Sequence, residues 1–197
     1  IAFIIITIIA NRRGLNDAAA VGIVEKVISF LFLVPSSMLS SVSALGAQNF
    51  GAGKPERAVE TLKYAIMIAV GFGITVAVVI QFAADPVVSL FTDNGTVIHS
   101  GGQYLRGYIW DCVFAGIHFS FSGYFCACQK SGLSFLHNIT AIVLVRVPGV
   151  YLMSKLFSDT LYPMGLATAA GSLLSVIICV IAFTILLKKE RENKAFR

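Results

Sequence analysis

One face of the segment from residue 103 to residue 129 carries polar side chains in an otherwise apolar stretch. On a helical wheel with Asp111 at zero and a step of about 100° per residue, His118 falls at about −20° and Ser122 at about +20°. Gln129 returns to about 0° on the same wheel. The pattern predicts a helix that turns this stripe toward its neighbours or a water-filled cavity. His118 taken alone is more typical of an interior histidine whose hydrogen bonds are satisfied.

Three further charged side chains are predicted to share the depth of Asp111. Counted from the ends of their helices, Asp111, Arg146 and Glu25 all lie roughly 10–13 Å from the same side, and Lys26 lies beside them. A charge at that depth is costly when it is isolated, so we expect Asp111 and Arg146 to form an ion pair. Such a pair either locks two helices permanently or changes when a proton or Na⁺ reaches the carboxylate. Arg106 is expected to extend outward from its helix end.

Aromatic residues accompany the polar stripe on the same segment. Phe114 and Phe121 fall beside it, as do Trp110, Tyr124 and Phe125. If the segment lines a cavity for an organic molecule, these rings are the candidates to contact that molecule.

The elements that must position these residues are membrane-spanning helices. Met164–Leu187 is 24 residues long and Ala65–Ala84 is 20 residues long, and neither contains a charged side chain. About 20 apolar residues suffice to cross the hydrocarbon of a bilayer. Hydrophobic residues make up 57% of the chain and charged residues 13%, below the roughly 25% of soluble domains. The chain is therefore predicted to be an integral membrane protein.

Turn-forming clusters divide the chain into a six-helix, all-α transmembrane bundle. Ile1–Ala10 is too short to cross the bilayer and is interpreted as the end of a truncated helix, so the chain is expected to be a fragment. Short loops predict that sequential helices are antiparallel neighbours. The five complete spans are expected at Ala18–Ala47, Tyr64–Ala84, Gln103–Gln129, Leu133–Ser154 and Tyr162–Leu187.

The basic residues are divided unequally between the two sides of the predicted bundle. Nine of the 15 Lys and Arg residues fall on one side and three on the other. Cytoplasmic loops carry an excess of Lys and Arg, so the richer side is predicted to be cytoplasmic. The nine are Lys54, Arg57, Lys63, Lys130 and the tail residues Lys188, Lys189, Arg191, Lys194 and Arg197. The tail 188–197 is interpreted as a membrane anchor at the cytoplasmic surface.

Two prolines and one stripe of small residues predict local geometry. Pro35 and Pro148-Gly149 each predict a kink, because proline frees a backbone carbonyl of the preceding turn. Ala167, Gly171, Ser175 and Cys179 recur every four residues, which lets another helix approach closely. This stripe is interpreted as a packing surface.

The sequence contains none of the motifs expected of the common enzyme classes. We found no zinc-protease, serine-hydrolase or phosphate-loop pattern. The four cysteines lie in or beside apolar segments without the spacing of a metal site. The net charge of +5 is assigned to the membrane surface and not to nucleic-acid binding. No cofactor is expected, and the function is predicted to be non-enzymatic.

Two sequence blocks resemble one transporter family. The run from Ala44 to Ala58, which contains Gln48-Asn49-Phe50-Gly51-Ala52, resembles the Q-N-x-G-A segment of multidrug and toxic compound extrusion (MATE) transporters. The preceding Leu15–Gly22 is similar to the family's entry to that helix, except that Gly14-Leu15 reverses the usual order. Family members have two six-helix halves. The resemblance implies that residues 1–197 are the C-terminal lobe, from the end of helix 7 through helix 12.

The resemblance also implies a function. MATE transporters exchange organic cations or other amphiphilic compounds for Na⁺ or H⁺, and some use an acidic residue in helix 10, which corresponds to the segment of Asp111. The expected partners are such substrates, membrane lipid and the N-terminal half, in a plasma or inner membrane. The predicted coupling and substrate residues are Asp111, His118, Ser122, Glu25, Arg146, Phe114 and Phe121.

Two alternatives to a multidrug antiporter remain open at this point. A flippase for lipid-linked oligosaccharides shares the bundle, but it is expected to have a more cationic central cavity. A non-transporting scaffold is the other alternative, and it has no need of an aligned acid and histidine.

Overall fold

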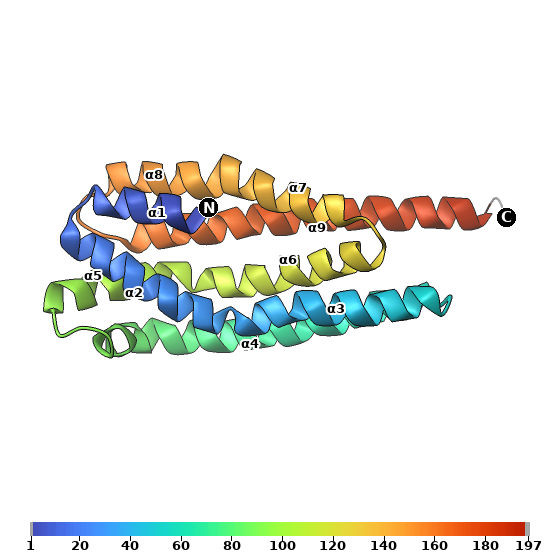
Figure 1. The fold of residues 1–197 in the computed structure, drawn as a ribbon, viewed down its shortest axis with the longest axis horizontal. Coiled ribbons are helices and arrows are strands. Elements are labelled where there is room, and N and C mark those ends of the chain that lie inside the picture. The colour runs from blue at the N-terminus through green and yellow to red at the C-terminus, as the bar shows by residue number, and fades with distance from the viewer. Residues whose placement is uncertain (1, 196–197) are drawn as a thin grey trace.

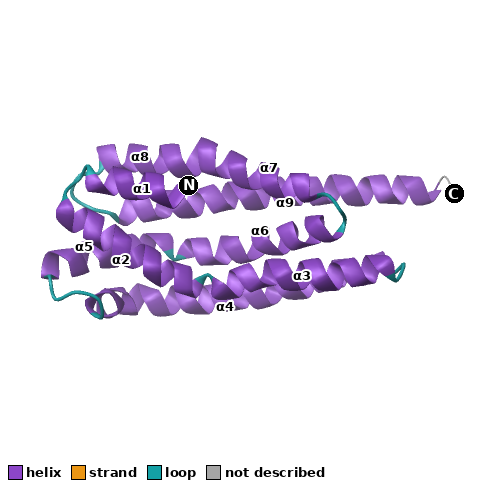
Figure 2. Ribbon diagram, viewed as in Figure 1, coloured by secondary structure: helices purple, strands orange, loops and turns teal. Residues whose placement is uncertain are grey.

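The computed structural model describes residues 2–195, and side chains as far as residue 189. All regular structure in that range is helical, and the helices run along one common axis as an elongated bundle (Figure 1). Four helical stretches are long and apolar enough to span a membrane, namely Leu15–Gly51, Pro55–Ser89, Ser131–Leu156 and Tyr162–Lys189. Very short loops join the helices (Figure 2).

The helices group into the six predicted rods. The rods are α1 (Ala2–Asn11), α2 (Leu15–Leu31) with α3 (Leu33–Gly51), α4 (Pro55–Ser89), α5 (Gly95–Tyr108) with α6 (Trp110–Ala127), α7 (Ser131–Ala141) with the π-helical turn η1 (Ile142–Arg146) and α8 (Val147–Leu156), and α9 (Tyr162–Ala195). Three of the predicted spans differ clearly from the helices. Helix α4 runs well past both ends of Tyr64–Ala84, α5 begins at Gly95 and not at Gln103, and α9 continues as a helix through most of the predicted tail.

The loops alternate between the two ends of the bundle, as predicted for antiparallel neighbouring helices. Loops 12–14, 90–94 and 157–161 lie at one end, here called the Arg13 end (Figure 1). Loops 52–54 and 128–130 lie at the other, here called the Lys54 end, where α9 also projects beyond its neighbours. Of the basic residues that were counted together, those up to Lys189 therefore gather at the Lys54 end, and the predicted tail residue Arg197 lies outside the described residues.

Both proline-associated kinks are present. The helix is interrupted at Phe32, three residues before Pro35, and the Ser36 and Ser37 hydroxyls donate to the carbonyls of Leu33 and Val34. Around Pro148 the helix opens into η1, which ends at Arg146. Proline removes a backbone donor, and a π-helical turn is one way in which a helix accommodates the resulting irregularity.

Helix α6 occupies the interior of the bundle. It packs against α3, α4, α7 and α9, and most of its residues are buried. Ala69 of α4 and Leu39 of α3 leave no space for a side chain at Gly116 and Gly123, so glycine permits these close crossings. Enclosure by protein explains why α6 tolerates more polar residues than the lipid-facing helices.

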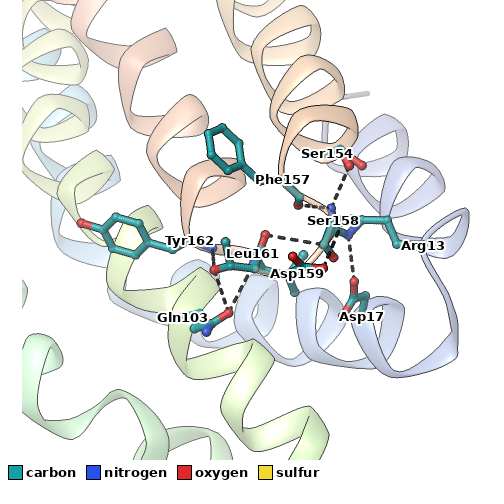
Figure 3. Close-up of polar contacts among 10 residues, drawn as sticks. Arg13, Asp17, Gln103, Ser154, Phe157, Ser158, Asp159, Leu161 and Tyr162 are labelled. Atoms are coloured by element: carbon teal, nitrogen blue, oxygen red, sulfur yellow. Dashed lines mark hydrogen bonds and ion pairs between the residues drawn. The ribbon is translucent and has the colours of Figure 1, made fainter.

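Hydrogen bonds from Arg13 link two loops at the Arg13 end (Figure 3). Its guanidinium donates to the carbonyl oxygens of Ser154, Phe157 and Ser158 at 2.7–2.8 Å, and Nε pairs with Asp17 at 2.8 Å. The Ser154 carbonyl lies in the last turn of α8 and the other two follow that turn, where helix geometry leaves carbonyls without partners. Arg13, predicted only as a loop charge, therefore links the α1–α2 turn to the α8–α9 loop.

Gly107 of α5 and Gly165 of α9 set the spacing of the two helices, and Gly165 offers a stability test. A Cβ on Gly165 would lie 2.6 Å from the Tyr108 nitrogen and closer still to the Tyr104 carbonyl oxygen. We expect Gly165→Ala to lower the free energy of unfolding by about 1–3 kcal/mol, because backbone atoms cannot move aside cheaply. Thermal unfolding in detergent measures the change. Gly71→Ala is the control, since a Cβ there has no described atom within 4 Å; equal losses in both variants would contradict the prediction.

Candidate functional site

The predicted ion pair between Asp111 and Arg146 is confirmed. Arg146 Nη2 lies 2.8 Å from Asp111 Oδ2 and also donates to Ser172 Oγ at 2.7 Å. The Asp111 side chain is completely buried and that of Arg146 is 15% exposed. The pair therefore joins α6, η1 and α9 in the interior of the bundle.

Local backbone features place the two charges. Asp111 lies in the first turn of α6, just after the interruption at Ile109. Arg146 ends η1, and Gly171 of α9 lets η1 approach, because a Cβ there would come within 2.8 Å of Arg146 Cβ. The small-residue stripe is thus a packing surface at Gly171, as predicted.

Several polar atoms around the ion pair have no hydrogen-bond partner among the described residues. They are Asp111 Oδ1, His118 Nδ1, Glu25 Oε1 and the hydroxyls of Tyr104 and Tyr108. Both tyrosines are fully buried and interact electrostatically with Asp111, Arg146 and Glu25. Buried polar groups are normally paired, so a cluster of unpaired ones is a candidate for binding an ion, water or a ligand.

A second hydrogen-bonded group continues from this cluster toward the Lys54 end. His137 of α7 contacts the Ser122 hydroxyl through Nε2 at 2.8 Å and the Ser175 hydroxyl through Nδ1 at 3.2 Å. The His118 and His137 rings lie 5.6 Å apart between centroids. Sequence reasoning missed His137, although a histidine inside an apolar span was available as a signal.

A pocket of about 240 Å³ opens beside the ion pair. Its polar lining comes from His118, Asn138, Arg146, Ser172 and Ser175. Its aromatic lining comes from Phe3, Phe32 and Phe119.

The remaining predicted site residues lie elsewhere or make different contacts. Phe114 and Phe121 are absent from the lining of this pocket, and Phe121 instead packs against Phe125 and Phe183. Glu25 accepts a hydrogen bond from Thr7 at 3.3 Å. Gln129 leaves the predicted stripe, because α6 ends at Ala127 and Gln129 has a left-handed backbone, with φ of 61°.

Arg106 has a partner that was not predicted from the sequence. It forms a two-pronged ion pair with Asp85 of α4, at 2.8 and 3.1 Å. Its Nε also donates to the Gln81 carbonyl oxygen. The predicted span ended at Ala84 and so stopped one residue short of this partner.

The fold and the buried polar cluster define one lobe of a polytopic membrane protein, and comparison with known proteins gives its family. Residues 1–152 match the family model described as MatE. The chain belongs to the MATE family.

A curated relative and solved structures agree with this assignment. The chain is 28% identical over 166 residues to a protein of Shewanella oneidensis named "FAD transporter", and the match covers 83% of this chain and 36% of that protein. A MATE crystallised in complex with MaL6 and one in the straight conformation each superpose with a TM-score of 0.88, at 16% and 17% identity. An inward-facing multidrug resistance MATE transporter gives a TM-score of 0.84 at 16% identity.

The superpositions match nearly all of this chain but only part of each solved chain. They include 97% of this chain and 43–44% of each solved chain. At such low identity the likeness concerns the fold. The chain spans less than half the length of these relatives, which agrees with the expected size of one six-helix half.

Proposed function

We propose that this chain is one lobe of a secondary active transporter that exports amphiphilic organic molecules in exchange for H⁺ or Na⁺, with Asp111 as the coupling carboxylate. The observation that carries the proposal is the hydrogen bonding of the two Asp111 carboxylate oxygens. One carboxylate oxygen pairs with Arg146, while the other is buried without a partner among the described residues. A carboxylate held in this way has a vacant acceptor for a proton or Na⁺.

The surrounding groups support a coupling role. Uptake of a cation by Asp111 removes the charge that holds Arg146, so the contact between α6 and η1 weakens when the ion binds. The irregular backbone at Ile109 and at η1 lies next to these two residues. Helix irregularities of this kind are common at functional sites in membrane proteins.

The cargo and the orientation belong to the same proposal. A relative named "FAD transporter" supports an organic cargo with planar rings, although the match covers only 36% of that protein. The complete transporter requires the other lobe as its partner within the same polypeptide. The basic residues at the Lys54 end favour a cytoplasmic position for that end, in a plasma or inner membrane.

Gradient-driven efflux from cells that express the complete protein tests this function. The probes are an ethidium-like cation and riboflavin, with an H⁺ or a Na⁺ gradient imposed in turn. We expect efflux of at least one probe to depend on one gradient, and that gradient identifies the coupling ion. Well-expressed, inserted protein that exports neither probe under either gradient would overturn the proposal in favour of a flippase or a scaffold.

A further inference from the structure

The pocket beside the ion pair has the chemistry of an anion site. Its lining contains the Arg146 guanidinium, two hydroxyls and the Asn138 amide, and none of the described residues that line it carries a carboxylate. Asp111 contacts Arg146 but is not part of the lining. While the two charges are paired, Arg146 is neutralised by its partner.

Arg146 has unused hydrogen-bonding capacity. A guanidinium carries five N–H donors in a planar fork. Both hydrogen bonds that Arg146 makes to described residues, to Asp111 and to Ser172, come from Nη2. Its Nε and Nη1 make no hydrogen bond to a described residue, but their N–H bonds do not lie side by side. A two-oxygen contact to a carboxylate, sulfonate or phosphate needs Nη2 together with one of them, and Nη2 is held by Asp111 and Ser172 while the pair is intact.

His118 provides an independent indication of a ligand. Its side chain lines the pocket, is only 6% exposed, and leaves Nδ1 without a partner among the described residues. An unpaired buried nitrogen costs free energy unless something else contacts it. On the other side, Phe32 and Phe119 supply rings against which an aromatic ligand can pack.

We propose that this pocket binds the anionic group of an aromatic substrate, and that Arg146 becomes available to it when Asp111 is neutralised by the coupling ion. The role of Asp111 in this inference rests on the function proposed above. An organic cation would gain nothing from Arg146 and would have to displace it from Asp111. An organic anion gains the guanidinium as soon as Asp111 loses its charge. The other ionisable groups around the pair are Glu25 on α2, Tyr104 and Tyr108 on α5, Cys112 and His118 on α6, and His137 on α7.

Equilibrium binding to the purified complete protein tests the proposal without any transport step. The probes share one ring system and differ in charge: 2-naphthalenesulfonate and 2-naphthylmethylammonium, followed by fluorescence polarisation. Asp111→Asn mimics the neutralised carboxylate. We expect it to bind the sulfonate on the order of tenfold more tightly than the unsubstituted protein does, because the Arg146 charge is no longer compensated.

Three comparisons make the result decisive. Arg146→Gln is expected to lose the sulfonate affinity, whereas Arg12→Gln, which changes an exposed arginine at the Arg13 end, is expected to retain it. If Arg146→Gln does not fold, Arg146→Lys takes its place in the experiment. Lysine keeps the positive charge but lacks the planar set of donors, so this variant is expected to bind the sulfonate more weakly. Unchanged sulfonate affinity in Asp111→Asn, or preference for the ammonium probe, would overturn the inference. Either outcome leaves gradient-driven efflux intact, so failure here is distinct from failure of the proposed function.

Discussion

Asp111→Asn in the complete protein is expected to reduce gradient-driven efflux to the level of cells without the transporter. Asparagine has nearly the same shape as aspartate and retains an oxygen that can accept from Arg146 Nη2. It cannot take up a proton in the accessible pH range, and it presents no negative charge to Na⁺. The variant therefore keeps one hydrogen bond to Arg146 but loses the ion-binding step. Efflux of the probe under the gradient that drives the unsubstituted protein is the measurement.

A matched carboxylate provides the control for this experiment. Asp85 also pairs with an arginine, Arg106, but at the Arg13 end, and its side chain is 41% exposed. We expect Asp85→Asn to keep most of the efflux, because an exposed ion pair contributes little and can exchange with water. Membrane insertion of both variants is checked by surface labelling. Unimpaired efflux in Asp111→Asn would show that the Asp111–Arg146 pair is only a lock between helices.

The sequence was sufficient to predict the bundle and its central ion pair. Uncharged stretches of 20 and 24 residues leave few alternatives to membrane helices. Depth along antiparallel helices then brought Asp111 and Arg146 into one layer, since helix rise is regular over that distance. Two kinks followed from Pro35 and Pro148, because proline has a fixed effect on the backbone.

The position of His137 relative to Arg146 could not be predicted from a regular helix. Residues nine apart in an α-helix lie about 180° apart, so His137 and Arg146 should face opposite ways. Both nevertheless contact α9, at Ser175 and Ser172 respectively. The turn η1 accommodates extra backbone and shifts the phase of the helix between them. A helical wheel drawn without η1 therefore places His137 and Arg146 on opposite sides, although both contact α9.

The ring contacts of α6 depended on neighbours that a single-helix pattern does not include. Phe121 lies beside the polar stripe on a wheel, but Phe183 of α9 and Phe125 enclose it in an apolar cluster. The rings that line the pocket come partly from other helices, Phe3 from α1 and Phe32 from the junction of α2 and α3. Packing between helices therefore decides which aromatic residues reach the site.

Arg146→Gln is expected to destabilise the protein, and a second substitution is expected to restore most of the loss. Removing the arginine leaves Asp111 as a fully buried charge, which typically costs about 3–5 kcal/mol. We expect the lower part of that range, because the Arg146 side chain is 15% exposed and lines the pocket. In Asp111→Asn combined with Arg146→Gln neither charge remains, so the free energy of unfolding should return toward that of the unsubstituted protein.

The double-mutant cycle also separates stability from transport. Unfolding in lipid nanodiscs gives the coupling free energy between Asp111 and Arg146. Efflux measured on the same variants should stay at background in the double variant, because the carboxylate that receives the ion is absent. Additive losses of stability would show that the two side chains do not interact in the membrane. If efflux returned together with stability, the pair would hold the helices in place without taking part in ion coupling.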